Sequence, residues 1–275
     1  MATRAESWYK AIPVRHSIRQ FDTSRQIAAE TLDQLRSVCQ EFRPFRGARA
    51  ELVTGSSLDG VFKGLIGSYG KINGANAFLA FVGDTMTSHI QEKVGYTGEG
   101  VVLEATSLGL GTCWVTGSFK PEVAASLLTK SDSEKILAVS PVGFASSKSS
   151  LWERAVKRGV RSEDRLPLES MITGAKSTEL PDWTRGAINA ARLAPSAKNR
   201  QPWSFEVTGD SITVGVRKDG DSSDISKRLD CGIAMLHLEV AITHADVNGK
   251  WEFLEAPQVA RFKIAEANRP NSRRR

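Results

Sequence analysis

The chain has 275 residues and a mass of 29.9 kDa, which corresponds to about two domains of ordinary size or one large domain. Hydrophobic residues make up 40% of it and charged residues 25%, so the composition excludes a wholly disordered or fibrous protein. The 37 Lys and Arg residues exceed the 31 Asp and Glu residues by 6, partly through the terminal Arg273-Arg274-Arg275, which we expect to be a tail.

Several classes of protein are disfavoured by what the sequence lacks. No apolar run approaches the ~18 residues of a membrane span, and residues 1–10 lack the apolar stretch of a signal peptide. Basic residues are interspersed with acidic ones almost throughout, and no motif typical of nucleic-acid binding occurs. We therefore expect neither nucleic acid nor a membrane as partner. The chain is therefore expected to be a globular protein of the cytoplasm.

The cysteines and most histidines do not form a pattern that predicts a metal site. Cys39, Cys113 and Cys231 are isolated, which disfavours a disulfide framework or a zinc site, and the last two are expected inside apolar helices. His89, His237 and His244 are scattered without an acidic or cysteine partner at useful spacing, so we expect ordinary surface or helix residues.

The first half begins with a predicted helix and strand. Apolar residues recur on one helical face over Ala28–Phe42, and Ala48–Val53 favours a strand. Unbroken apolar runs at Ala77–Val82 and Ile136–Phe144 are typical of strands buried on both faces. Between them, Gly100–Trp114 is predicted to be a helix that ends near Gly109 and Gly111, and Pro121 is predicted to open a helix over Glu122–Leu128.

A polar segment from Ser146 to Lys176 is interpreted as a connection, and a second series of elements follows it. The predicted elements are a helix over Trp183–Leu193 with Asp182 as N-cap, a hairpin of Ser204–Val207 and Ile212–Val216 around Gly209-Asp210, a helix over Arg228–His244, and a strand ending the stretch Trp251–Lys263.

The second series resembles the first. Helix and strand follow in the same order, and the strands end in Val-Thr-Gly at 53–55 and at 207–209. We therefore expect an α+β fold of two pseudo-twofold-related repeats, each with a mixed or antiparallel sheet packed by helices. The expected division is a first repeat with its connection at 1–176, a shorter second repeat at 177–268, and a basic tail at 269–275.

One segment in the first half carries an unusual set of polar groups. Arg15-His16-Ser17-Ile18-Arg19 holds two guanidiniums, a hydroxyl and an imidazole. In an extended segment Arg15, Ser17 and Arg19 would point the same way, and the planar donor fork of arginine suits phosphate oxygens. The alternative is a set of solvated surface charges.

A second segment lies in the other half. In Ala194–Trp203, with the sequence APSAKNRQPW, two prolines bracket a run of small and amide residues between a helix and a strand. Asn199 and Gln201 carry both donors and acceptors, which suits the edge of a heterocycle. The alternative is a rigid surface turn with Trp203 as a core anchor.

Together these segments resemble the nitroreductase superfamily of flavin mononucleotide (FMN) enzymes. Members begin with an Arg-[Arg/His]-Ser-x-Arg segment followed by Phe, here RHSIRQF, and carry a Pro-Ser-x-x-Asn-x-Gln-Pro-Trp loop, here PSAKNRQPW. The stretches Leu108–Gly117 and Arg165–Glu169 are similar to two further family segments. In ordinary members both main segments lie near the N-terminus, whereas Gln40–Arg49 lacks the loop here, so the chain resembles a fused, internally duplicated subtype that imitates the family dimer.

The resemblance implies a set of FMN contacts. One set of residues is implied to contact the phosphate and ribityl end of FMN, and a second set is implied to contact the flavin. The resemblance implies no catalytic acid or base and no metal ligand. The implied cofactor-binding residues are Arg15, His16, Ser17, Arg19 and Arg165 at the phosphate and ribityl end, Lys71 at the pyrimidine, Thr116 and Gly117 near flavin N5, and Pro195, Ser196 and Asn199 along the isoalloxazine.

The implied function is an FMN-dependent NAD(P)H oxidoreductase. Hydride would pass from the nicotinamide to flavin N5 and then to a nitroaromatic, quinone or similar small-molecule acceptor. One flavin site per chain is implied, and a second chain would no longer be required. The alternatives are a non-catalytic FMN-binding protein for flavin storage or sensing, and a basic interaction protein on the same scaffold.

Overall fold

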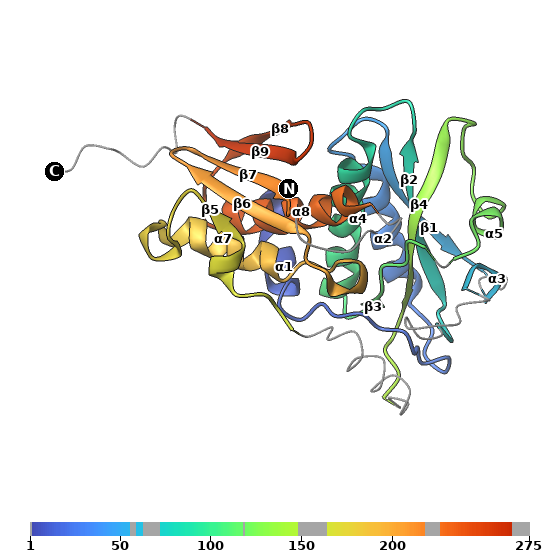
Figure 1. Cartoon of the computed structure of the whole chain (residues 1–275). Coiled ribbons are helices and arrows are strands. Elements are labelled where there is room, and N and C mark those ends of the chain that lie inside the picture. The colour runs from blue at the N-terminus through green and yellow to red at the C-terminus, as the bar shows by residue number, and fades with distance from the viewer. Residues whose placement is uncertain are drawn as a thin grey trace.

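In the computed structural model, residues 2–55, 59–62, 72–117, 119–147, 164–217 and 226–265 are described. Two β-sheets lie towards opposite ends of the molecule, and helices fill the space between them (Figure 1). The prediction of an α+β fold with antiparallel or mixed sheets packed by helices is confirmed. Within the described ranges, none of the helices combines the length and the apolar character needed to span a bilayer.

The first sheet is antiparallel throughout, with the strand order β1-β2-β4-β3. Its strands are β1 (Ala48–Thr54), β2 (Ala77–Asp84), β3 (Gly111–Thr112) and β4 (Glu134–Gly143), and its helices are α2 (Ala29–Glu41), α3 (Asp59–Phe62), α4 (Ile90–Ser107) and α5 (Pro121–Ala125). In β2, Leu79 and Phe81 face the main core, while Phe78 and Val82 face a second cluster beneath α3 and α5. The predicted burial of this strand on both faces is confirmed.

The second sheet is mixed, with the order β5-β6-β7-β9-β8, in which only the β5–β6 pair is parallel. Its strands are β5 (Ile172–Thr173), β6 (Trp203–Thr208), β7 (Ser211–Val216), β8 (Gly249–Phe253) and β9 (Gln258–Ile264). The remaining helices are α1 (Ala2–Ala11), α7 (Asp182–Arg192) and α8 (Lys227–His244), with 3₁₀ turns at Leu168–Ser170, Ser177–Glu179 and Ala197–Asn199. Gly209, at a φ of +51°, makes the predicted hairpin turn between β6 and β7.

The two sheets share one connectivity. The order β1-β2-β4-β3 of the first sheet matches β6-β7-β9-β8 of the second, with β5 added at one edge. In each case a long helix links the second strand to the third: α4 follows β2, and α8 follows β7.

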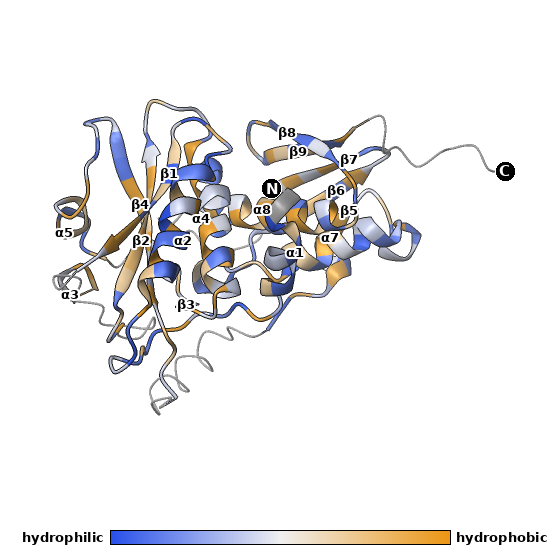
Figure 2. Cartoon of the chain, turned by 180° about the vertical axis from the view of Figure 1, so that it is seen from behind, coloured by the Kyte–Doolittle hydropathy of each residue, from blue (hydrophilic) through white to orange (hydrophobic). Residues whose placement is uncertain are grey.

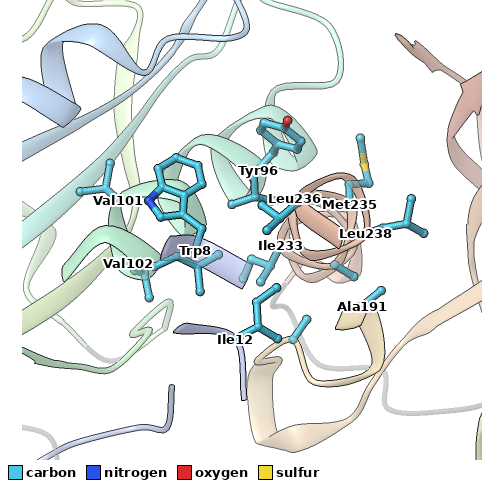
Figure 3. Packing of buried hydrophobic residues seen from close by; sticks show 14 of the residues in the cluster. Trp8, Ile12, Tyr96, Val101, Val102, Ala191, Ile233, Met235, Leu236 and Leu238 are labelled. Atoms are coloured by element: carbon cyan, nitrogen blue, oxygen red, sulfur yellow. The ribbon is translucent and has the colours of Figure 1, made fainter. Parts of the chain in front are cut away.

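The main core lies between the sheets, where the apolar faces of α1, α4, α7 and α8 meet (Figure 2). Figure 3 shows Trp8 of α1 and Ile12, which directly follows this helix, in one cluster with Val101 of α4 and with Ile233 and Leu236 of α8. None of these five side chains is more than 3% exposed. Helix α1, which the sequence analysis did not predict, is therefore part of the core.

Helices α4 and α8 cross where each contributes a glycine. A methyl group on Gly95 of α4 would collide with the backbone oxygen of Leu229, and one on Gly232 of α8 would collide with that of Glu92. The contact is reciprocal. Leu229, which Gly95 faces, lies three positions before Gly232, and Glu92, which Gly232 faces, lies three positions before Gly95. The two helices can approach this closely only without side chains at these positions.

Several predicted boundaries are wrong. Helix α4 begins at Ile90 and ends at Ser107, so the predicted helix over Gly100–Trp114 started too late and ended too late. The glycines inside α4 are poor helix formers in isolation, and their close packing outweighs that cost. Gly109, at a φ of +76°, ends the helix, so Cys113 lies just after β3 rather than in a helix. Asp182 is the first residue of α7 and Pro181 its N-cap, and the stretch after α8 forms two strands.

We predict that Gly95→Ala destabilises the protein by about 2 kcal/mol, because the added methyl overpacks a backbone contact that cannot yield. The matched control is Gly186→Ala in α7, where an added methyl meets no described atom within 4 Å. That variant should gain about 0.5–1 kcal/mol from helix propensity. Urea denaturation measures both free energies of unfolding. If the two substitutions changed the free energy of unfolding equally, the close contact of α4 with α8 would not explain why residue 95 is a glycine.

Candidate functional site

The segment from Arg15 to Arg19 runs in an extended form between two other parts of the first half. The amide of Arg15 bonds the carbonyl of Ala11 at the end of α1 (2.9 Å), and the amide of Ile18 bonds the carbonyl of Thr112 in β3 (2.8 Å). The carbonyl of Arg19 accepts from the amide of Asn73 (3.1 Å). The backbone is thus held at three points.

Arg15 is buried by this arrangement, with 9% of the residue exposed. Its Nε and Nη1 atoms have no hydrogen-bond partner among the described residues. Burial lowers the pKa of its guanidinium, and attraction to Glu99 opposes this shift. The interpretation as solvated surface charges is therefore wrong for Arg15, although His16 is exposed and Ser17 and Arg19 are half-buried.

The loop after α7 adopts a strained conformation. Lys198, Asn199 and Gln201 have φ angles of +53°, +54° and +46°, in the left-handed region that favours glycine. Each such residue costs on the order of 1 kcal/mol and persists only where the surroundings enforce it. Residues with this kind of strain are concentrated at binding and catalytic sites.

Asp230, in the first turn of α8, is the main anchor of the loop. It accepts hydrogen bonds from the amide of Ala197 (3.2 Å to Oδ2) and from Nε of Arg200 (2.9 Å). The side chains of Arg200 and Asp230 are only 7% and 2% exposed. Burial raises the pKa of Asp230 to about 6, although Arg200 lowers it. The hydroxyl of Ser196 accepts from the amide of Gln201 (2.9 Å), which closes the turn.

Two amide side chains connect the loop to the segment that precedes the 3₁₀ turn at Leu168–Ser170. Nη1 of Arg165 donates to Oδ1 of Asn199 (2.8 Å), and Nδ2 of Asn199 donates to the carbonyl of Asp164 (2.8 Å). Oε1 of Gln201 accepts from the amide of Leu166 (2.9 Å). These amides therefore hold Arg165 in place.

Arginines from three parts of the chain converge here. Burial lowers the pKa of the Arg165 guanidinium, and repulsion from Arg15 and Arg192 lowers it further. Arg192, at the end of α7, donates from Nε to the carbonyl of Leu166 (2.8 Å). The charge of Arg15 in the first half thus acts on Arg165, which itself donates to Asn199 of the loop. A cluster of desolvated guanidiniums of this kind attracts an anion.

The remaining predicted site residues lie in the loop after α7, in the segment after β3, or outside the described residues. Pro195 is buried and Ser196 is half-buried within the loop. Thr116 is half-buried and Gly117 is exposed, just after the bridge between Val115 and Val139. Lys71 lies outside the described residues. Among the described residues, no group of His, Cys, Asp and Glu side chains is arranged to hold a metal ion.

The sequence analysis missed the acidic partners of the histidines. His89 contacts Glu92 (3.1 Å), His237 contacts Glu99 (2.8 Å), and His244 contacts Glu6 (2.9 Å). The spacing of His89 and Glu92 could have revealed the first pair. His237 does lie in a helix, α8, as expected, but it is fully buried and its partner Glu99 is distant in sequence, so the spacing along the chain could not have revealed this pair.

Comparison with known proteins gives the family. The family model described as "Putative TM nitroreductase" matches residues 7–242. The chain belongs to this nitroreductase family. No curated protein sequence matches it.

A solved structure shares the fold over nearly the whole chain. A Thermotoga maritima protein described as a "putative nitroreductase" is 18% identical with a TM-score of 0.63, over 94% of this chain and 93% of its own. A Bacteroides fragilis nitroreductase with bound FMN is 19% identical with a TM-score of 0.42, over 52% of this chain and 91% of its own. A Clostridium difficile nitroreductase family protein is 18% identical with a TM-score of 0.46, over 62% and 98%.

We predict that Asp230→Ala destabilises the protein by about 3 kcal/mol at neutral pH, because Arg200 loses a buried counter-charge and Ala197 loses an acceptor. The control is Asp33→Ala, which removes the exposed partner of Arg36 and should change stability by less than about 0.5 kcal/mol. Chemical denaturation compares the two. A cost at Asp230 no larger than that at Asp33 would show that the loop does not depend on this pair.

Proposed function

We propose that the chain binds FMN and is an oxidoreductase that uses NAD(P)H as electron donor. The observation that carries the proposal is the buried guanidinium of Arg15, whose Nε and Nη1 lack partners among the described residues. Leaving buried donors of a charged group without acceptors costs several kcal/mol. An anionic ligand would supply both the acceptors and the missing negative charge.

A flavin mononucleotide fits these requirements better than a neutral ligand. Its phosphate is a dianion near neutral pH, and guanidiniums bind phosphate oxygens in a bidentate manner. Arg15 is buried and Arg165 is half-buried, and repulsion from Arg15 lowers the pKa of Arg165. Family membership supports the same cofactor, because nitroreductases of the superfamily that the sequence resembles are FMN enzymes.

The proposed contacts follow the two segments. Arg15, Ser17, Arg19 and Arg165 would hold the phosphate and ribityl end, with His16 at the exposed edge of the same segment. Flavin contacts are proposed for the loop residues Pro195, Ser196 and Asn199, for Thr116 and Gly117, and for Lys71, which lies outside the described residues. Asn199 has a second role, because its Oδ1 atom fixes Nη1 of Arg165.

Bound FMN would supply hydride transfer between NAD(P)H and an acceptor such as a nitroaromatic or a quinone. The protein would contribute position and charge. Arg15 and Arg165 would stabilise negative charge on the cofactor and attract the anionic nucleotide donor. The rigid loop would fix the flavin relative to these cations, and we assign no side chain as acid or base.

We extend the proposal to the origin of the fold. The strand order that β1-β2-β4-β3 shares with β6-β7-β9-β8 and the reciprocal crossing of α4 and α8 support an internal duplication that imitates a dimer. In the first half, Gln40–Arg49 stands where the loop would be expected, and its Phe45 packs on Tyr96 (5.0 Å between ring centroids) and Phe253 (5.1 Å). On this proposal, each chain binds one FMN and functions as a monomer.

We predict that Arg15→Ala weakens FMN binding about 30- to 100-fold, the loss expected for charge-assisted hydrogen bonds. The control is Arg36→Ala, which removes an exposed arginine paired with Asp33 and should leave affinity unchanged. Titration by flavin fluorescence gives both dissociation constants and the stoichiometry, for which we expect one FMN per chain. Unchanged affinity in the Arg15 variant would refute the assigned site.

The purified protein is predicted to be yellow and to bleach anaerobically on addition of NADPH or NADH, with the colour returning when a nitroaromatic or a quinone is added. Visible absorbance follows each step. A colourless protein that takes up no FMN would refute the proposal. Bound flavin that neither nucleotide reduces would instead favour a role in flavin storage or sensing.

A further inference from the structure

Arg192, the last residue of α7, is cross-linked to Arg165 through the backbone. Nε of Arg192 donates to the carbonyl of Leu166, the residue after Arg165 (2.8 Å). In return, Nη2 of Arg165 donates to the carbonyl of Leu193, the residue after Arg192 (3.3 Å). Each guanidinium therefore binds the backbone next to the other arginine, and the two cations are held in the same small region.

This arrangement is unfavourable without a ligand. Repulsion from Arg192, together with burial and repulsion from Arg15, lowers the pKa of Arg165. An anion bound between the guanidiniums would replace this repulsion with attraction. The cross-linked backbone contacts keep the cations from moving apart when no anion is bound.

The end of the Arg192 side chain can still accept a ligand. The residue is half-buried, and among the described residues its Nη1 and Nη2 atoms form no hydrogen bond and no ion pair. Glu169 is the acidic residue whose pKa reflects Arg192, but its own backbone amide and Ser177 lower that pKa more. The two terminal nitrogens form a planar fork that fits two oxygens of a phosphate.

The number of cations favours a phosphate monoester over a carboxylate. A phosphate monoester has three strong acceptor oxygens and up to two negative charges near neutral pH. It can therefore accept from more than one guanidinium at once. A carboxylate has two oxygens and a single charge, so a second arginine beside it would stay largely uncompensated.

We propose that Arg192 is a phosphate-binding residue, whose terminal nitrogens bind a phosphate monoester together with Arg165. The inference rests on the proposed function in its two sources of that group, the phosphate of FMN and the 2′-phosphate of NADPH. Both offer the same chemistry to the arginines, and the experiment distinguishes them.

Arg192→Gln separates phosphate binding from a structural role. Nε2 of glutamine stands at the same place along the side chain as Nε of arginine, so the variant can keep the hydrogen bond to Leu166 while it loses the terminal nitrogens and the charge. The matched control is Arg185→Gln on the same helix. Arg185 is also half-buried and also donates to a carbonyl, that of Leu180 (3.4 Å), but it is already paired with Asp182.

Two ratios measure the contribution of a phosphate. FMN and riboflavin share one ring system, so the ratio of their affinities in isothermal titration reports the phosphate of the cofactor. NADPH and NADH differ by the 2′-phosphate, so the ratio of their kcat/KM values with a quinone as acceptor reports the phosphate of the donor. Arg192→Gln should lower one or both ratios roughly five- to tenfold, and Arg185→Gln should change neither.

The ratio that falls identifies the phosphate that Arg192 binds. Arg192→Lys, which keeps the charge, should retain more of that ratio than Arg192→Gln. The inference is overturned if neither ratio changes, including the case in which both members of a pair lose affinity alike, as a merely structural role would produce. It is also overturned if Arg185→Gln lowers the same ratio as much.

Inorganic phosphate separates this inference from the proposed function. If the unsubstituted protein binds no FMN and accepts electrons from neither nucleotide, the proposed function fails, and thermal unfolding in phosphate tests Arg192 alone. Phosphate should raise the unfolding midpoint above that in chloride at equal ionic strength, and by less in Arg192→Gln than in the unsubstituted protein. Equal shifts in the two proteins would overturn the inference.

Discussion

Helices α4 and α8 cross at Gly95 and Gly232, where each backbone occupies the space that a methyl group on the other would need. This approach places the two sheets on either side of one shared core. It also sets the distance between residues on the two helices, among them Glu99 and His237 one or two turns beyond the crossing. The candidate site depends on this contact, because Arg15 belongs to the first half, and the loop that holds Asn199 is anchored on α8 through Asp230.

The site gathers features that are unfavourable for stability. Arg15 is buried with unpartnered donors among the described residues, three residues of one loop have left-handed backbones, and Asp230 is desolvated enough for its pKa to rise to about 6. A fold selected for stability alone would replace such groups with apolar ones of similar volume. Their occurrence together at one place is therefore an argument for function that is independent of the family match.

A feature of the structure could be predicted from the sequence where the interactions that determine it act between residues close together in the chain. The apolar run of β2 and the turn at Gly209 were predictable, because periodicity and glycine geometry act over a few residues. The start of α4 was not, because its glycines are poor helix formers whose presence is explained only by the packing of α8. The burial of Arg15 also depends on remote contacts, through Thr112 and Asn73. The motifs RHSIR and PSAKNRQPW indicated the site through resemblance, but not that Asn199 and Gln201 hold the segment around Arg165.

A buried cation can be tolerated in two ways, by a ligand that comes and goes or by a permanent counter-charge within the protein. A permanent ion pair at Arg15 would have satisfied its donors and removed its attraction for an anion. A fully isolated guanidinium would have made the ligand-free protein costly to fold.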